Sequence, residues 1–172
     1  MKKTILAIAS AVFLFTACGK KTTPENTQSE IAAPATEATT PATSESSKNV
    51  LVTLNAGDDM KYDLSEIKVK EGQTVKLTLK HIGKLPVTAM GHNFVLLAAG
   101  VDVPKFATEA VNAKDNGYIP KGMEKDIIAH TKTIGGGETT EIEFPAPAKG
   151  TYDFICSFPG HYVMMKGKFI VE

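Results

Sequence analysis

The sequence contains few of the features on which common enzyme and nucleic-acid-binding motifs depend. Its 172 residues include only two cysteines, and 19 basic side chains balance 19 acidic ones. Charges of both signs are interspersed, so there is no basic region of the kind that binds nucleic acid. No internal repeat, no Gly-x-Ser-x-Gly nucleophile elbow and no glycine-rich phosphate loop is present. These absences argue against nucleic-acid binding and against the corresponding enzyme classes.

An apolar run near the N-terminus is too short to span a membrane. It covers residues 5–15, follows two lysines and is interrupted by a single serine, which is typical of a signal peptide. Two small residues then precede Cys18, and this resembles the bacterial lipobox, in which the cysteine is lipidated and becomes the first mature residue. Phe15 stands where leucine is more usual, which leaves cleavage by the ordinary signal peptidase as the alternative. We expect residues 1–17 to be the signal peptide of an exported bacterial lipoprotein, anchored by Cys18 and facing the periplasm or held at the outer membrane.

The composition changes twice after Cys18. Residues 18–48 are rich in Thr, Ala, Ser, Pro and Glu, with Ile31 as their one large apolar side chain. Such a segment buries too little surface to offset the entropy of ordering it, so we expect a disordered tether. Residues 49–172 alternate apolar and polar side chains and have the length of one domain.

The cysteine count limits what Cys156 can do. If Cys18 carries lipid, Cys156 is the one remaining cysteine of an exported protein, and no internal disulfide is available. A lone thiol outside the cytoplasm is open to oxidation unless something else binds it. Coordination to a metal is the natural alternative.

The alternation in residues 49–172 predicts an all-β, Greek-key β-sandwich with one short helix between Pro104 and Asn116. Period-two patterns with one polar face favour antiparallel sheets. Leu51 adds an apolar side chain to the second face of the first strand, which predicts that this strand is covered on both sides. A turn at residues 71–73 is expected between the second and third strands. The expected strands lie at 50–54, 67–69, 75–79, 93–97, 126–131, 139–144, 151–156 and 166–171.

Four side chains form a candidate metal site. Cys156, His161 and Met165 fall within ten residues, and His92 lies upstream. Cys156 shares a strand face with Phe154, so it should point inward at the end of that strand. A thiolate, two imidazoles and a thioether are the ligands of a blue-copper electron-transfer centre, because Cu(I) favours soft sulfur and Cu(II) favours imidazole. Protein fills every ligand position, whereas a catalytic metal keeps one open, so we expect one copper ion and no enzymatic activity.

These motifs resemble the azurin group of the cupredoxin family over nearly all of residues 49–172. The resemblance rests on Met-Gly-His-Asn at 90–93, His81 with Leu-Pro at 85–86, Ile-Ala-His-Thr-Lys at 128–132 and the Cys-x4-His-x3-Met spacing, which selects Met165 over Met164. It implies a weak axial contact from the Gly91 carbonyl and a supporting role for Asn93, which would tie the His92 strand to the Cys156 loop. The chain departs from the group in lacking a disulfide near the domain start and in having Phe94 where tryptophan is typical.

Two further histidines, His81 and His130, are not expected to bind the metal. The resemblance places His81 beneath the surface near the site, where a structural role is favoured over titration coupled to the copper redox state. His130 is expected on the surface without a role.

Two functions fit this site: a membrane-tethered electron carrier, or a protein for copper storage, delivery or sensing. The closed mixed-ligand site favours the electron carrier, because a delivery site should be exposed and exchangeable. The resemblance implies transient redox partners such as c-type cytochromes or copper or haem reductases. It also places the edge of His161 at the centre of an apolar docking patch. The alternative is that some of these side chains, Leu85 and Phe158 in part, belong to the core. The expected patch comprises Met60, Leu85, Ala89, Met90, Phe158, Pro159, Val163 and Met164.

Overall fold

The computed structural model describes residues 48–172. The expected signal peptide, Cys18 and the tether up to residue 47 lie outside the described residues. Within residues 48–172, no helix is both long enough and apolar enough to cross a membrane.

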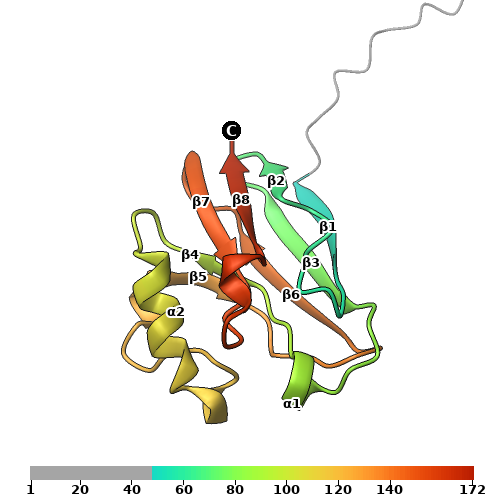
Figure 1. The fold of residues 1–172 in the computed structure, drawn as a ribbon. Helices are drawn as coiled ribbons and strands as arrows, with labels where there is room; N and C mark the ends of the chain where they lie inside the picture. Colours follow the sequence, from blue (N-terminus) through green and yellow to red (C-terminus); the bar gives the residue numbers. More distant parts are fainter. Residues whose placement is uncertain (1–47) are drawn as a thin grey trace, which may run out of the picture. The chain divides into compact units, whose positions relative to one another are not determined.

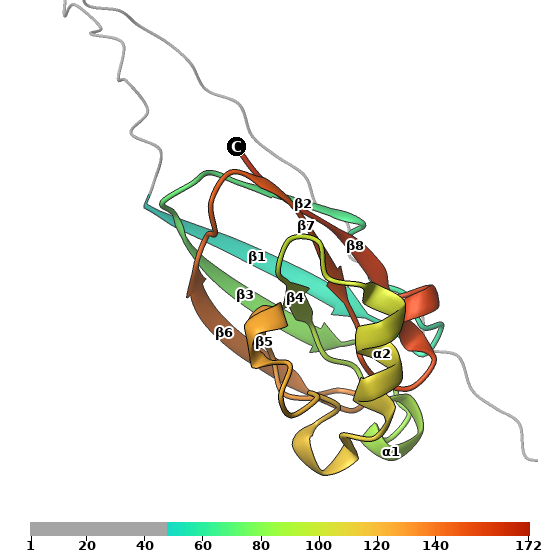
Figure 2. The ribbon, with the colours of Figure 1, turned by 90° about the vertical axis from the view of Figure 1, so that its left-hand side faces the viewer.

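Two β-sheets face one another and enclose the core (Figures 1 and 2). One sheet has three strands in the order β1-β3-β6, and the other has five in the order β2-β8-β7-β4-β5. The expected two-sheet sandwich is confirmed. The strands are β1 (Asn49–Ala56), β2 (Glu66–Val69), β3 (Thr74–His81), β4 (Val95–Leu97), β5 (Ile127–His130), β6 (Thr139–Pro145), β7 (Gly150–Ile155) and β8 (Lys166–Val171).

Phenylalanine rings join the two sheets at the centre of the sandwich. Phe144 of β6 lies 6.4 Å from Phe94, which precedes β4, and 5.9 Å from Phe169 of β8, measured between ring centroids. Phe94 in turn lies 5.4 Å from Phe154 of β7. Tilted and offset rings at these distances add to the stabilisation that comes from burying their apolar area. This packing fixes the end of β7, where Cys156 follows.

The expected short helix is confirmed as α2 (Val103–Val111), which covers β4 and β5 (Figure 1). Asp102 caps it, because its side chain accepts a hydrogen bond from the Lys105 N–H at 3.0 Å. Phe106 and Ala110 are buried at the spacing of one helical face. A second, single-turn helix, α1 (Val87–Met90), was not expected. It leads directly into the stretch that contains His92.

Two expectations about the sheets are wrong. β1 pairs with β3 in parallel and β2 pairs with β8 in parallel, so the sheets are mixed rather than antiparallel. The turn at residues 71–73 exists, with Gly72 at φ 79°, but it joins strands of different sheets. Leu51 is 78% exposed, because β1 is an edge strand with one face in solvent. Alternation indicates which side chains are buried, but it does not identify the partner strand.

Candidate metal centre

Three of the four expected ligands converge at one end of the sandwich. The Cys156 Sγ lies 3.7 Å from the His161 Nδ1 and 4.0 Å from the His92 Nδ1. All three donor atoms lie within 4.8 Å of one another, and all three residues are buried. Bonds of about 2.0 Å to nitrogen and 2.3 Å to sulfur, at 120°, separate the two donor atoms by about 3.7 Å. The spacing therefore suits a single trigonally bound ion.

His92 is held by both its backbone and its ring. Its backbone N–H and carbonyl pair with Ile134 at 2.9 and 2.8 Å. The ring Nε2 lies 2.9 Å from the carbonyl oxygen of Gly57, to which it must donate its proton. This bond selects the tautomer that leaves Nδ1 free to bind a metal.

The ligand loop after β7 is closed by backbone hydrogen bonds. Cys156 N–H donates to the Met165 carbonyl at 2.9 Å, and Met165 N–H donates to the His161 carbonyl at 2.7 Å. Met165 is fully buried beside the other ligands. The Gly91 carbonyl oxygen lies 3.9 Å from the Cys156 sulfur. His92, Cys156, His161 and Met165 are thus arranged as a blue-copper site.

Burial controls the protonation of these ligands. It raises the pKa of Cys156 to about 12 and lowers the pKa of His161 to about 4. Burial also lowers the pKa of His92, although its hydrogen bond to Gly57 opposes the shift. Without a metal at neutral pH, the thiol is protonated and both imidazoles are neutral. A bound cation must therefore displace the thiol proton, which couples metal binding to pH.

Asn93 connects the stretch containing His92 to the Cys156 loop. Its Oδ1 accepts a hydrogen bond from the Ser157 N–H at 2.9 Å, and its Nδ2 donates to the Ser157 Oγ at 2.8 Å. The Asn93 carbonyl accepts a short hydrogen bond from the hydroxyl of Tyr62. These contacts fix the separation between the segment that supplies one imidazole and the segment that supplies the sulfur.

His161 is the ligand that reaches the surface. It is 3% exposed, and its Nε2 has no hydrogen-bond partner within residues 48–172. Every fully buried side-chain nitrogen or oxygen in that range has a partner, so the His161 Nε2 must touch solvent. The exposed area is smaller than the resemblance suggested, but it lies at the ring edge opposite the metal-binding nitrogen.

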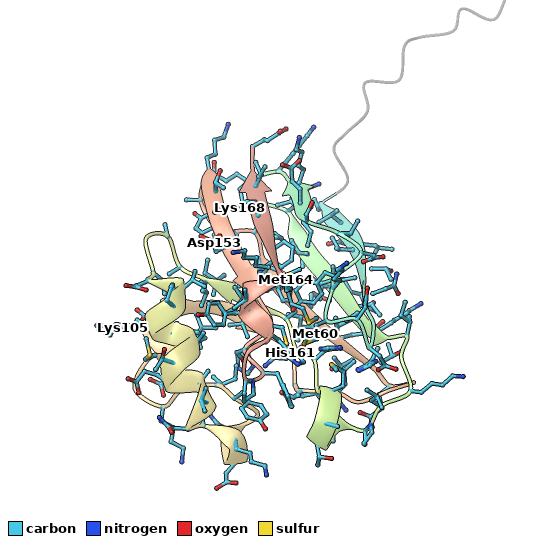
Figure 3. All side chains as sticks on the ribbon, in the orientation of Figure 1. Met60, Lys105, Asp153, His161, Met164 and Lys168 are labelled. Carbon is cyan, nitrogen blue, oxygen red and sulfur yellow. The ribbon has the colours of Figure 1, made fainter. Side chains whose placement is uncertain are left out.

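Most members of the expected docking patch are on the surface. Met164 is 57% exposed, Val163 54%, Leu85 42% and Met60 38%. Figure 3 labels Met60, His161 and Met164 at this end of the domain. The larger exposure of Leu85 does not support a core role, whereas Phe158 is buried. Ala89 is exposed, and Met90 and Pro159 are half-buried.

Both ring nitrogens of His81 have hydrogen-bond partners. Its Nε2 lies 2.7 Å from the Met90 carbonyl oxygen, and its Nδ1 accepts from the Gly83 N–H at 3.1 Å. The ring stacks on His92 with 4.3 Å between centroids. These contacts support the structural role. His130 is exposed at the end of β5, and its Nδ1 lies 3.1 Å from the Thr131 carbonyl oxygen.

Sequence reasoning missed several residues that support the site, and three of them lie between β1 and β2. They are Gly57, whose carbonyl holds His92; Tyr62, whose hydroxyl holds Asn93; and Asp58. The Asp58 carboxylate accepts from the Lys84 N–H at 2.8 Å, a bond that lowers its pKa, and it lies 4.0 Å from the His81 Nε2. A glycine followed by two aspartates does mark a turn here, but nothing in the sequence shows where that turn packs.

A buried thiol and two imidazoles at the end of a β-sandwich define a blue-copper electron-transfer protein. The chain belongs to the copper-binding plastocyanin/azurin family, whose model matches residues 48–172. It is 44% identical over 121 residues to azurin of Pseudomonas fluorescens biotype C, covering 67% of this chain and 93% of that protein. It is 38% identical over 124 residues to outer membrane protein H.8 of Neisseria gonorrhoeae, covering 70% of this chain and 66% of that protein. The solved structure of auracyanin A, a blue copper protein from Chloroflexus aurantiacus, superimposes with a TM-score of 0.66 at 33% identity, covering 72% of this chain and 99% of that one.

Proposed function

We propose that this protein is a lipid-tethered electron carrier that exchanges single electrons with redox proteins outside the cytoplasm, through His161. One observation carries the proposal: the donor atoms are buried, and His161 alone among the three buried donors has a ring nitrogen that is unpartnered and touches solvent. When bound, copper supplies the one-electron redox couple. The protein supplies a fixed ligand geometry and a short path to the surface.

The hydrogen bonds around the ligands favour electron transfer over copper delivery. Gly57 holds His92, Ser157 and Asn93 hold the loop, and the backbone of Met165 closes it. A ligand set held in this way changes little between oxidation states, which keeps the rearrangement for each electron small. Storage or delivery requires donors that an incoming copper carrier can reach, and here His92 and Cys156 are fully buried. We also propose that the protein is not an enzyme, because the expected ligand set fills every position, whereas a catalytic metal keeps one open.

The surface around His161 suits partners that dock briefly. Small, weakly polar interfaces favour fast dissociation, which a carrier needs in order to turn over. The thioethers of Met60, Met90 and Met164 provide an adaptable surface that can fit more than one partner. Redox proteins such as c-type cytochromes or copper or haem reductases are the partners we propose. The docking patch is the set expected from the sequence, with Phe158 as its buried support.

The membrane attachment is proposed from the sequence. Residues 1–17 have the pattern of a lipoprotein signal peptide, Cys18 is the lipidation site, and residues 19–48 have the composition of a flexible tether. A relative of similar sequence bears the name outer membrane protein, which supports a membrane location for this chain.

Repeated voltammetry of the copper-loaded protein tests the function. We expect intense blue absorption in the oxidised state, its reversible loss on reduction, and full retention of copper over many cycles with a chelator in solution. Release of copper to the chelator on each reduction would instead support delivery. The same measurement on Cys156→Ser serves as the control for copper bound elsewhere on the chain.

A further inference from the structure

The backbone at Gly117 and Tyr118 aims two consecutive carbonyls at the ligand segments. Both residues are left-handed, with φ of 63° and 64°. The Gly117 carbonyl accepts from the Asn93 Nδ2 at 3.2 Å and from the Thr133 Oγ1 at 2.8 Å. The Tyr118 carbonyl accepts from the Ser157 Oγ at 2.7 Å. Residues 117–118 are therefore hydrogen-bonded to the immediate neighbours of both His92 and Cys156.

The ring of Tyr118 contacts the same loop through Phe158. The two rings meet edge-on, with 4.9 Å between centroids and an angle of 61°. Phe158 lies 4.6 Å from the His161 ring. It also fills the space in front of Gly91, where an added Cβ would come within 2.7 Å of the phenyl carbons. Phe158 thus packs against a ligand and against the glycine beside His92, with Tyr118 as a further support.

His161 needs such packing more than His92 does. A metal-binding histidine usually fixes its ring by donating its other N–H, as His92 does to Gly57. The Nε2 of His161 has no partner within residues 48–172, so the ring orientation in the protein depends on its neighbours. Phe158 is one of those neighbours, and its ring in turn contacts the ring of Tyr118.

The left-handed conformation of Tyr118 is itself unfavourable for a residue with a side chain. Glycine adopts this conformation freely, whereas other residues do so at a cost that the surrounding structure must offset. The contacts that Tyr118 makes through its carbonyl and its ring must therefore offset the strain. The contact with Phe158 is one that the structure shows.

We propose that Tyr118 is a positioning residue of the copper site. Through Phe158 its ring fixes the His161 imidazole, and through its carbonyl it fixes Ser157, so the ligand loop keeps one geometry. This inference rests on the blue-copper electron transfer proposed above and deepens it, because it identifies a residue outside the ligand set that keeps the geometry constant.

Two substitutions in the full chain separate the ring from the backbone. Tyr118→Gly relieves the left-handed strain and removes the ring, whereas Tyr118→Phe keeps the ring and is the matched control. The first readout uses the metal-free protein: the rate at which iodoacetamide alkylates the buried Cys156, followed by mass spectrometry of the Cys156 peptide. We expect Cys156 to react about tenfold faster in Tyr118→Gly. This ratio corresponds to a decrease of about 1.4 kcal/mol in the free energy of opening the ligand loop. Tyr118→Phe should react at the wild-type rate.

The second readout is spectroscopic. In the copper-loaded protein, Tyr118→Gly should broaden the copper hyperfine lines of the electron paramagnetic resonance spectrum and slow electron self-exchange several-fold, because His161 samples more than one orientation. Wild-type line widths and exchange rates in Tyr118→Gly would overturn the proposal. So would a change of equal size in Tyr118→Phe, in which the ring is retained.

A third variant distinguishes positioning from general stability. Val171→Ala truncates a buried side chain at the C-terminal end of β8, opposite the turn that carries His161 (Figures 1 and 3). If this variant loses as much thermal stability as Tyr118→Gly and also exposes Cys156 equally, Tyr118 acts only through global stability and the proposal fails. Should Tyr118→Gly not fold, Tyr118→Asn takes its place, because asparagine tolerates the left-handed region. A wild-type protein without blue absorption would instead overturn the proposed function.

Discussion

The Nε2 of His92 donates to the carbonyl oxygen of Gly57 at 2.9 Å, across 35 positions of sequence. No such bond holds the second imidazole ligand within residues 48–172, because the Nε2 of His161 meets solvent instead. One imidazole is therefore fixed from inside the domain, and the other is left free on its outer edge. This asymmetry fits a carrier in which one ligand supports the site and the other meets the partner.

Replacing the sulfur ligand should remove the colour and leave the fold. Cys156→Ser keeps a small side chain at the end of β7, so we expect a folded sandwich by circular dichroism. The blue absorption arises from the copper–thiolate bond and should disappear from the visible spectrum of the copper-loaded variant. Retention of the blue band would show that Cys156 is not the ligand. Val171→Ala, at a buried position outside the ligand loop, is the control and should remain blue.

Replacing the axial ligand Met165 should affect the copper site less than replacing Cys156. Met165→Leu keeps an apolar side chain of similar volume and removes the thioether, and the axial ligand adjusts the potential of such sites rather than creating them. We expect the variant to stay blue and its reduction potential, measured by voltammetry, to rise. Met164→Leu is the control, because Met164 is exposed next to the site, and it should leave the potential nearly unchanged. Complete loss of copper from Met165→Leu would contradict this assignment.

The metal-free protein should lose stability as the pH falls from about 6.5 to about 4. Burial lowers the pKa of His161 to about 4. Below the ordinary histidine pKa of about 6.5, His161 therefore binds a proton in the unfolded chain but not in the folded chain. Stability is therefore present above the unfolded pKa and is lost on acidification, by about 2–3 kcal/mol for this residue. His92, whose pKa is also lowered by burial, acts in the same direction. Urea unfolding of the metal-free protein at a series of pH values measures the slope, and His161→Gln should reduce it. An unchanged slope in that variant would assign the effect to other groups.

The elements and the ligands could be predicted because their signals are local. Each expected strand is present, because apolar and polar side chains alternate along stretches such as residues 75–79 and so indicate which side chains are buried. The spacing from Cys156 to Met165 lies within one loop, so three of the four ligands could be identified without the fold. Strand partners could not be predicted, because side-chain alternation is the same for parallel and antiparallel pairing.

The contacts that support the ligands were also not predicted from the sequence, and they matter more for the site than the strand partners do. Gly57 acts through a backbone carbonyl and Tyr118 through a left-handed backbone, and neither property depends on a recognisable side-chain pattern. The burial of His161, which is 3% exposed, was also underestimated. Its exposed edge depends on how Phe158 and the turn at residues 161–163 pack around it, which is decided only in the folded chain.

Membrane attachment is open to a direct test. If Cys18 carries lipid, the wild-type chain should fractionate with membranes and carry the mass of a lipidated N-terminus. Cys18→Ala should fail to be processed as a lipoprotein, while its copper domain still turns blue, because residue 18 lies outside residues 48–172. Recovery of the wild-type chain as a soluble periplasmic species would contradict the proposed anchor.

A charge placed beside His161 should slow electron exchange without altering the copper. Val163 and Met164 are 54% and 57% exposed and follow His161 directly in its turn. Met164→Lys or Val163→Asp should therefore be tolerated by the fold and leave the visible spectrum nearly unchanged. In self-exchange, two copies must bring their patches together, so each charge is partly desolvated and meets a like charge. We expect the self-exchange rate to fall at least about tenfold at low salt and to recover partly at high salt.

Leu51→Lys is the matched control, because Leu51 is 78% exposed on β1, outside the patch. An equal loss of rate in Leu51→Lys would reflect net charge alone, and unchanged rates in the patch variants would place the docking surface elsewhere on the domain.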